Sequence, residues 1–387
     1  MPTFKRPFSD AIAYFQVGNS KTFNKFEAIK WADGDVSKIH LYFLDDVWDN
    51  IDLTVEPTET WSQLMRDRCI QVRDQCKTLA IAYSGGYDSQ TILDHCILNN
   101  IKVDELITVT FNYFWDKARW QQPEGKSGPL LAQWYKENVY PNLKISTINR
   151  DVDYLLKIYD QPEDKWLFTN NQEIGFLKSH RAMQVEYSEA GARVLDVNHK
   201  IVLDGHEKPR LIIKDGWWHT AFPDVVLQFS INSPYESFFL SREMPKLHLK
   251  QIHMMINWIE GFPFSTLQEA NELLESSQGK FPENWPYHAW NLAVGRNMVK
   301  HWNSFDCLSS GKKGNLPSGM FDLVNKYFFE VHWNTVKPAI QKWHGTVTNF
   351  INDYSNAFDG THQKTIWSKL YPIKPVELGR VTSNRIL

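Results

Sequence analysis

The sequence contains few cysteines, and their spacing limits the kinds of site that they can build. The four are widely separated and form no Cys-x-x-Cys pair: Cys69, Cys76, Cys96 and Cys307. Structural zinc sites and the disulfide frameworks of small secreted proteins both depend on closely spaced cysteines. We therefore expect buried free thiols and no zinc site built from cysteine.

Long apolar runs and a large excess of one charge are also missing. No run is long enough to span a bilayer, and the opening MPTFKRPFSD has no apolar signal core. We expect no membrane association and a cytoplasmic location. The formal net charge of −3 supplies no basic field for nucleic acid. A nucleic-acid partner stays open but has no support from charge.

The composition is that of a globular protein with material for a large core. Apolar residues make up 42% and charged residues 22% of 387 residues, with 16 Trp, 15 Tyr and 23 Phe. At about 150 residues per domain, this length predicts two domains, or one large domain with additions.

Residues 77–100, KTLAIAYSGGYDSQTILDHCILNN, contain the most informative pattern. An apolar run from 79 to 83 is followed by two glycines and then by apolar residues at three- and four-residue spacing. The last of these are Ile92, Leu93, Cys96 and Ile97. This order predicts a strand, a glycine turn and an amphipathic helix.

Such a turn suits a phosphate ligand. Gly85 and Gly86 let the backbone approach a ligand closely, and the first N–H groups of the helix point into the turn. Ser84 and Ser89 add hydroxyl donors. Asp88 is the only carboxylate of the loop, which makes sense if a divalent cation such as magnesium lies between it and phosphate. The lysine of a Walker A loop is absent.

Strand-like and helix-like segments alternate on both sides of the loop. We expect a helix from Thr58 or Thr60 to about Gln75, strands at 39–44, 104–110 and 143–148, and helices at 128–140 and 152–159. This alternation predicts an α/β fold with a doubly wound, mostly parallel sheet. Ligands bind beyond the carboxyl ends of such strands. Val109 and Thr110 end the second strand there, so they either flank adenine or belong only to the core.

A second charged segment lies at residues 200–224. Strand-like pieces at 200–203 and 211–214 surround a turn at 205–209, and the Asp-Gly pair at 215–216 predicts a further turn. Within the first turn, Lys208 and Arg210 can neutralise a leaving group, and Glu207 can hold magnesium. The two pieces and the turn predict a hairpin, and a charged hairpin tip that is merely solvated is the alternative.

The string Ser84-Gly85-Gly86-Tyr87-Asp88-Ser89 resembles the SGGxDS signature of the PP-loop (N-type) ATP pyrophosphatases. This superfamily contains asparagine synthetase, GMP synthetase, NAD synthetase and tRNA-modifying enzymes. The wider match is closest to phage-encoded asparagine-synthetase-like proteins and covers roughly 23–253. The segments that carry it are 48–50 (WDN), 56–57 (EP), 205–210 (GHEKPR) and 245–253 (PKLHLKQIH). It implies the HUP fold and, for a phage protein, the host cytoplasm.

The resemblance also implies a reaction. An acceptor carboxylate or carbonyl oxygen attacks the α-phosphorus of ATP, pyrophosphate leaves, and ammonia or an amine then displaces AMP. ATP and Mg²⁺ would be bound by the loop residues named above, with Asp88 and Glu207 at the metal. Lys208 and Arg210 would stabilise the leaving group.

Full asparagine synthetase carries a glutaminase domain with a cysteine directly after the initiator methionine, where this sequence has Pro2. We therefore expect a separate ammonia or amine source, and a small molecule or a nucleobase as acceptor. Alternatives are a nucleobase-modifying PP-loop enzyme, which usually brings cysteines that are missing here, and a PAPS-reductase-like enzyme, for which Cys307 lacks a suitable context. A nucleotide-binding module without turnover also stays open.

The predicted domains are an N-terminal extension at 1–76, the PP-loop domain at 77–253 and a mainly helical region at 254–387. His248 and His253 are five residues apart, so we expect core or surface histidines rather than metal ligands. His253 with Lys250 and Gln251 is a weaker hypothesis for an acceptor pocket.

Overall fold

The computed structural model describes residues 11–23, 25–85, 87–111, 123–150, 200–205, 210–224, 235–278 and 366–379. The predicted helix at 152–159 lies outside these ranges, as does Cys307. None of the helices within them is long and apolar enough to cross a membrane.

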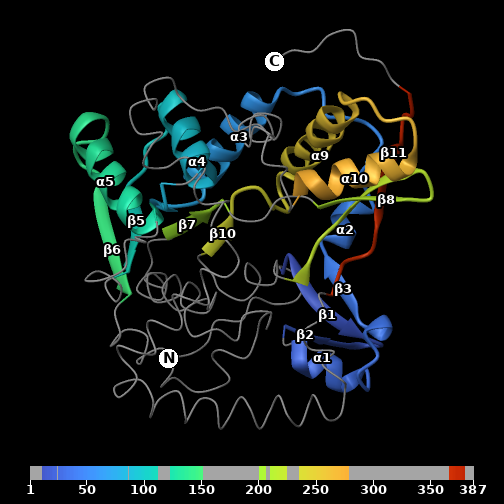
Figure 1. Cartoon of the computed structure of the whole chain (residues 1–387). Coiled ribbons are helices and arrows are strands. Elements are labelled where there is room, and N and C mark those ends of the chain that lie inside the picture. The colour runs from blue at the N-terminus through green and yellow to red at the C-terminus, as the bar shows by residue number, and fades with distance from the viewer. Residues whose placement is uncertain are drawn as a thin grey trace, which may run out of the picture.

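Three sheets and their helices make up the described part (Figure 1). In chain order the elements are β1 (Ala13–Val17), β2 (Ser20–Thr22), α1 (Lys25–Trp31), the 3-10 helix η1 (Val36–Lys38), β3 (His40–Phe43), α2 (Asp45–Trp48), α3 (Trp61–Asp74), β4 (Thr78–Ala82), α4 (Tyr87–Leu98), β5 (Glu105–Phe111), α5 (Pro123–Asn138), β6 (Lys144–Arg150), β7 (Lys200–Asp204), β8 (Arg210–Lys214), β9 (Trp217–Ala221), β10 (Tyr235–Ser237), α9 (Pro245–Glu260), α10 (Leu267–Gln278) and β11 (Tyr371–Pro375).

The central sheet has five strands in the order β10-β7-β4-β5-β6, and every neighbouring pair is parallel. From β4 the chain winds outward through β5 to β6, with α4 and α5 as the crossovers. It then returns to the other side of β4 to form β7 and β10. This order confirms the predicted α/β fold with a doubly wound parallel sheet, consistent with a PP-loop-like fold.

Both faces of the central strand β4 are buried, as expected inside a parallel sheet. Leu79 and Ile81 of β4 pack in one apolar core with residues of α3, α4 and α5. Ala80 and Ala82 point to the other face and join a second core with residues of β1, β3 and α9. β4 therefore lies between two packed layers, which hold its carboxyl end in place.

Helix α3 begins where the sequence predicted. The Thr60 side chain accepts from the Gln63 N–H at 3.2 Å, and the Gln63 side chain accepts from the Thr60 N–H at 2.8 Å. This capping box satisfies backbone donors that the helix itself cannot pair. Further along, the fully buried guanidinium of Arg68 donates to the carbonyls of Ser237 and Phe238 at 2.8 and 3.0 Å. Arg68 thereby fixes α3 to the chain after β10.

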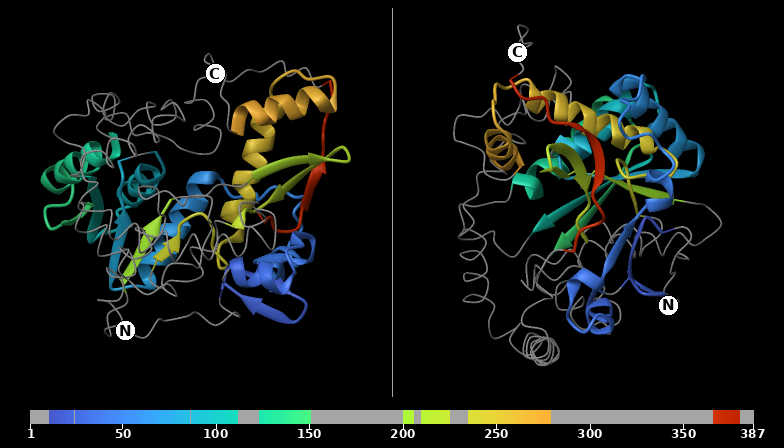
Figure 2. Two further views of the ribbon diagram at one scale, coloured as in Figure 1. Left: turned by 60° about the horizontal axis from the view of Figure 1, so that its bottom comes forward. Right: turned by 90° about the vertical axis from the view of Figure 1, so that its right-hand side faces the viewer.

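Two antiparallel sheets flank the central one, in the orders β2-β1-β3 and β11-β9-β8. Figure 2 shows α9 and α10 beside the β8–β9 hairpin and β11. Asp215 and Gly216 have φ of 51° and 77° at the tip of that hairpin, so the predicted Asp-Gly turn is confirmed.

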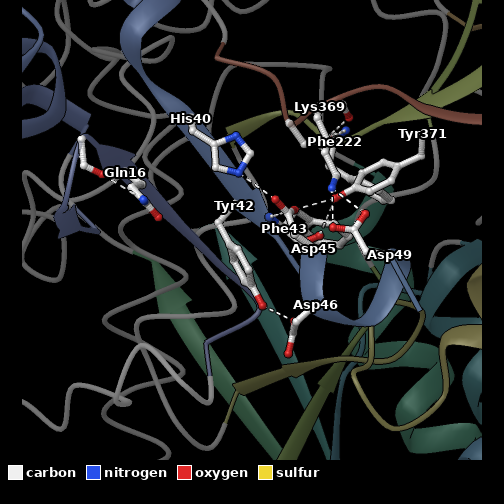
Figure 3. A network of polar contacts seen from close by, with 12 residues as sticks. Gln16, His40, Tyr42, Phe43, Asp45, Asp46, Asp49, Phe222, Lys369 and Tyr371 are labelled. Carbon is white, nitrogen blue, oxygen red and sulfur yellow. Dashed lines mark hydrogen bonds and ion pairs between the residues drawn. The ribbon is translucent and has the colours of Figure 1, made fainter. Parts of the chain in front are cut away.

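A polar network connects β11 with β3 and α2 (Figure 3). Asp45 accepts from the Tyr371 hydroxyl at 2.5 Å and pairs with His40 at 2.7 Å. Nearby, Lys369 pairs with Asp49 at 2.6 Å. The contacts of Tyr371 and Lys369 join segments more than three hundred residues apart along the chain. No pattern in the final residues predicts a strand, so β11 was missed.

Two further expectations are corrected. β7 and β8 do not form a hairpin: β7 pairs with β4 and β10, whereas β8 pairs with β9 in another sheet. The run Ile201-Val202-Leu203 lies between two parallel neighbours, a position typical of continuous apolar sequence. Helix α5 begins at Pro123 rather than residue 128, because proline is favoured in a first helical turn. Helix α9 runs through the proposed boundary at residue 253, and the domain division stays a prediction.

Candidate functional site

The glycine loop lies at the point where the strand order of the central sheet reverses. β4 lies between β5, the next strand along the chain, and β7, which arrives after β6. The loop follows the carboxyl end of β4, and Gly205 follows the carboxyl end of β7. Open parallel sheets bind ligands in the crevice at this position.

The loop has the backbone conformation that its glycines allow. Gly85 has φ of 72°, a region that costs other residues energy. The Ser84 N–H donates to the Ser89 hydroxyl at 3.3 Å, and the two serine hydroxyls are 3.4 Å apart. The loop thus folds back on the first turn of α4, where the helix dipole favours an anion.

Asp88 in that first turn lies against the end of β7. A Cβ built on Gly205 would be 2.8 Å from the Asp88 Cβ and 3.0 Å from the Asp88 carbonyl carbon. Only glycine permits this approach. The half-buried Asp88 and the buried Asp204 therefore stand at adjacent ends of β4 and β7.

A buried polar network lies behind the loop. The Tyr83 hydroxyl donates to the Gln90 carbonyl oxygen at 2.5 Å, and the Gln90 amide nitrogen donates to Asp94 and to the Tyr135 hydroxyl at 2.5 and 2.7 Å. Burial raises the pKa of Tyr83 well above its ordinary value, so its hydroxyl stays a donor. The network fixes the residue immediately before the loop to both α4 and α5.

The other predicted ligands are only partly described. Val109 and Thr110 lie near the end of β5, paired with Ile148 and Asn149 of β6. Their side chains lie outside the described residues, as do Gly86, the Tyr87 side chain and residues 206–209 with Glu207 and Lys208.

Arg210 is described as the first residue of β8, with an exposed side chain. It belongs to the three-stranded sheet and not to the central one. Five residue steps separate Arg210 from Gly205, so the Cα atoms of these two residues lie within roughly 18 Å of each other. Arg210 is therefore close enough in the chain to remain a candidate for charge stabilisation.

The residues of the weaker acceptor-pocket hypothesis lie on α9, and the structure shows the contacts of Lys250 and His253. Lys250 pairs with Glu56 at 2.6 Å and donates to the Pro57 carbonyl at 3.0 Å, and His253 lies 3.0 Å from the Leu53 carbonyl. Two segments of the resemblance, 48–57 and 245–253, thus pack on one another. The side chains of Lys250 and His253 hold α9 to residues 53–57.

Histidines and acidic groups of the described residues form no metal cluster: no three of His, Cys, Asp and Glu among them come together in a suitable arrangement. His248 is buried, and burial lowers its pKa to about 3. It lies 5.4 Å from the Trp48 ring, centroid to centroid. His248 is thus a core histidine, one of the two places expected for it, and Asp88 with Glu207, which lies outside the described residues, stays the proposed magnesium pair.

Sequence reasoning gave no role in the site to two residues that the structure places beside it. Gly128 of α5 lies against the loop backbone, and Asp204 is buried at the carboxyl end of β7. Gly128 was predicted only to begin a helix, because no local pattern shows which residue of a helix will contact a distant loop. Asp204 precedes a glycine after an apolar strand, and that signal could have found it.

Comparison with known proteins adds little to this geometry. No family model and no curated protein matches the chain. Among solved structures, it is similar to "NH3-dependent NAD synthetase from Campylobacter jejuni subsp. jejuni NCTC 11168 in complex with the nitrate ion". The identity is 14% and the TM-score 0.30, over 67% of this chain and 99% of that chain. The fold assignment therefore rests on the strand order.

Proposed function

We propose that this chain is an ATP-dependent, AMP-forming ligase of the PP-loop type, similar to asparagine synthetase. One observation carries the proposal: the SGGYDS loop follows β4 at the reversal of strand order, with Asp88 against the end of β7. A parallel sheet binds ligands there, and the loop offers backbone N–H groups, two hydroxyls and one carboxylate.

The loop fits a polyphosphate with a divalent cation. Gly205 and Gly128 let the end of β7 and helix α5 approach the loop more closely than a Cβ would allow. Ser84 and Ser89 supply hydroxyl donors for pyrophosphate oxygens. Asp88, with Glu207, would hold Mg²⁺, which prefers carboxylate and phosphate oxygens. Bound there, the cation would neutralise charge that develops on the leaving pyrophosphate.

The reaction we propose needs no side-chain nucleophile. An acceptor oxygen forms a bond to the α-phosphorus while the bond to the bridging oxygen breaks, and pyrophosphate leaves with that electron pair. Lys208 and Arg210 stabilise this charge. Ammonia or an amine then attacks the activated carbon, loses a proton and displaces AMP. Positioning and electrostatics supply the rate enhancement.

The acceptor is a small molecule or a nucleobase, and the nitrogen comes from free ammonia, an amine or a partner enzyme. A cytoplasmic location, in the host if the gene is phage-borne, belongs to the same proposal. The three described cysteines are buried and free, which gives no support to a PAPS-reductase-like reaction.

The test is release of pyrophosphate and AMP from Mg·ATP over a panel of carboxylates and nucleobases. We expect acceptor-stimulated release by the wild type, and none by Asp88→Asn, which keeps the size of the side chain. Asp74→Asn is the matched control, because Asp74 is an exposed carboxylate at the end of α3, near the amino end of β4. The five residues of β4 separate it from the loop by about 17 Å.

ATP binding without turnover on any acceptor would favour a nucleotide-binding module. Absence of ATP binding in the wild type would refute the proposed function.

A further inference from the structure

Helix α5 lies against the glycine loop at Gly128. A Cβ built on Gly128 would be 3.2 Å from the carbonyl oxygens of both Tyr83 and Ser84, and 3.3 Å from the Ser84 carbonyl carbon. Gly128 is buried. Two consecutive carbonyl oxygens of the loop therefore lie against the α5 backbone.

This contact determines which way the next two N–H groups point. In a planar trans peptide the C=O and N–H groups point in opposite directions. With the Tyr83 carbonyl against Gly128, the Ser84 N–H must point away from α5, and it does: it meets the Ser89 hydroxyl at 3.3 Å. The Ser84 carbonyl likewise turns the Gly85 N–H away from α5. Successive N–H groups on one side of a turn make an anion-binding concavity.

Helix α5 is held firmly enough to impose this orientation. Tyr135 lies seven residues after Gly128, two helical turns, and so on the same face of α5. Its hydroxyl accepts from Gln90 at 2.7 Å, and Gln90 accepts from Tyr83 at 2.5 Å. The Tyr83 and Tyr135 rings pack edge to face, with centroids 6.4 Å apart. Gly128 and Tyr135 thus contact the backbone and the side chain of the same segment.

We propose that Gly128 is a positioning residue for the phosphate site: its missing side chain lets α5 hold the two carbonyls back, so that the Ser84 N–H faces the Ser89 hydroxyl and the Gly85 N–H faces pyrophosphate. The inference rests on the proposed function and names a residue outside the SGGYDS string. A methyl group at 128 must push the loop by a few tenths of an ångström, because the atoms that it meets are backbone.

The variant Gly128→Ala tests this role by calorimetric titration with Mg·ATP and, separately, with inorganic pyrophosphate. We expect about a tenfold loss of affinity for both, the scale at which one charge-assisted hydrogen bond is weakened. Alanine has the higher helix propensity, so the unfolding temperature is not expected to fall in parallel. A structural role alone would lower the unfolding temperature and leave affinity unchanged at low temperature. Leu130→Ala, an exposed site on α5, is the control and should bind as the wild type.

If Gly128→Ala does not fold, a measurement on the wild type still tests the inference. With ¹⁵N-glycine labelling, the Gly85 amide resonance should shift as pyrophosphate is added. Equal pyrophosphate affinity of Gly128→Ala and wild type would overturn the inference and leave the proposed function standing. So would an unmoved Gly85 resonance at saturating pyrophosphate. A wild type that binds neither ligand would overturn both.

Discussion

The tightest backbone contact at the site makes a sharp prediction about Gly205→Ala. The added Cβ would be 2.8 Å from the Asp88 Cβ and 3.0 Å from its carbonyl carbon. Ordinary carbon–carbon contacts lie at about 3.5 Å or more, so β7 and α4 must separate by roughly 0.7 Å. Rotating a side chain gives no relief, because both atoms of Asp88 move with the backbone.

Two effects of different size follow. Overpacking of this kind costs about 1–3 kcal/mol of unfolding free energy, which lowers Tm by roughly 2–4 °C for each kcal/mol in a domain of about 200 residues. The carboxylate proposed to hold Mg²⁺ moves with the first turn of α4. Misplacement by about 1 Å costs about a hundredfold in rate, so we expect at least about a tenfold loss in turnover or Mg·ATP affinity.

The assay is Mg·ATP titration and thermal unfolding of Gly205→Ala beside Gly216→Ala. Gly216 has φ of 77° and nothing within 4 Å of an added Cβ, so alanine there is strained without a clash. Alanine at position 216 should cost about 1–2 kcal/mol of unfolding free energy, which is comparable to the cost of Gly205→Ala. Gly216, however, lies in the β8–β9 turn and not beside Asp88. If the two variants bind Mg·ATP equally well, the close approach of Gly205 to Asp88 does not position the site and the reasoning is refuted.

Three further predictions concern buried groups. His248 has a pKa of about 3 against an ordinary 6.5, so the unfolded chain takes up its proton first and stability is lost as pH falls from 6.5 toward 3. Between pH 7 and 5 the free energy of unfolding should fall by about 2 kcal/mol, and urea unfolding of His248→Leu should not show this fall. An equal fall in the wild type and the variant would contradict the low pKa of His248. Arg68→Leu leaves two buried carbonyls without this donor and should cost about 3–5 kcal/mol, against less than about 1 kcal/mol for the exposed Arg66→Leu. The neighbouring Cys69 thiol and burial raise the pKa of Cys96, so iodoacetamide at pH 8 should label the Cys96 peptide only after denaturation; labelling of the native protein would show that the thiol is accessible.

Local sequence determined the elements that depend on neighbouring residues. Thr60 and Gln63 cap α3, and Asp215-Gly216 turns the β8–β9 hairpin, each through contacts within a few residues. The apolar run before Ser84 predicted β4. The alternation of strands with helices also predicted the doubly wound parallel sheet, because crossover connections are short and of one hand.

Tertiary structure alone decided which distant segments meet. β7 pairs with β4 and not in the predicted hairpin, because its apolar run Ile201-Val202-Leu203 gains more from two buried faces than from a neighbour in sequence. Gly128 and Gly205 matter at the loop only because α5 and β7 bring them to Ser84 and Asp88, and their own neighbours in the chain carry no sign of it. The sequence by itself determined the glycine turn after β4, since close backbone approach needs glycine locally. Packing between residues far apart in the chain decides the contact of α5 with this turn, the position of the Asp88 carboxylate beside β7, and strand β11. No local pattern encodes these contacts.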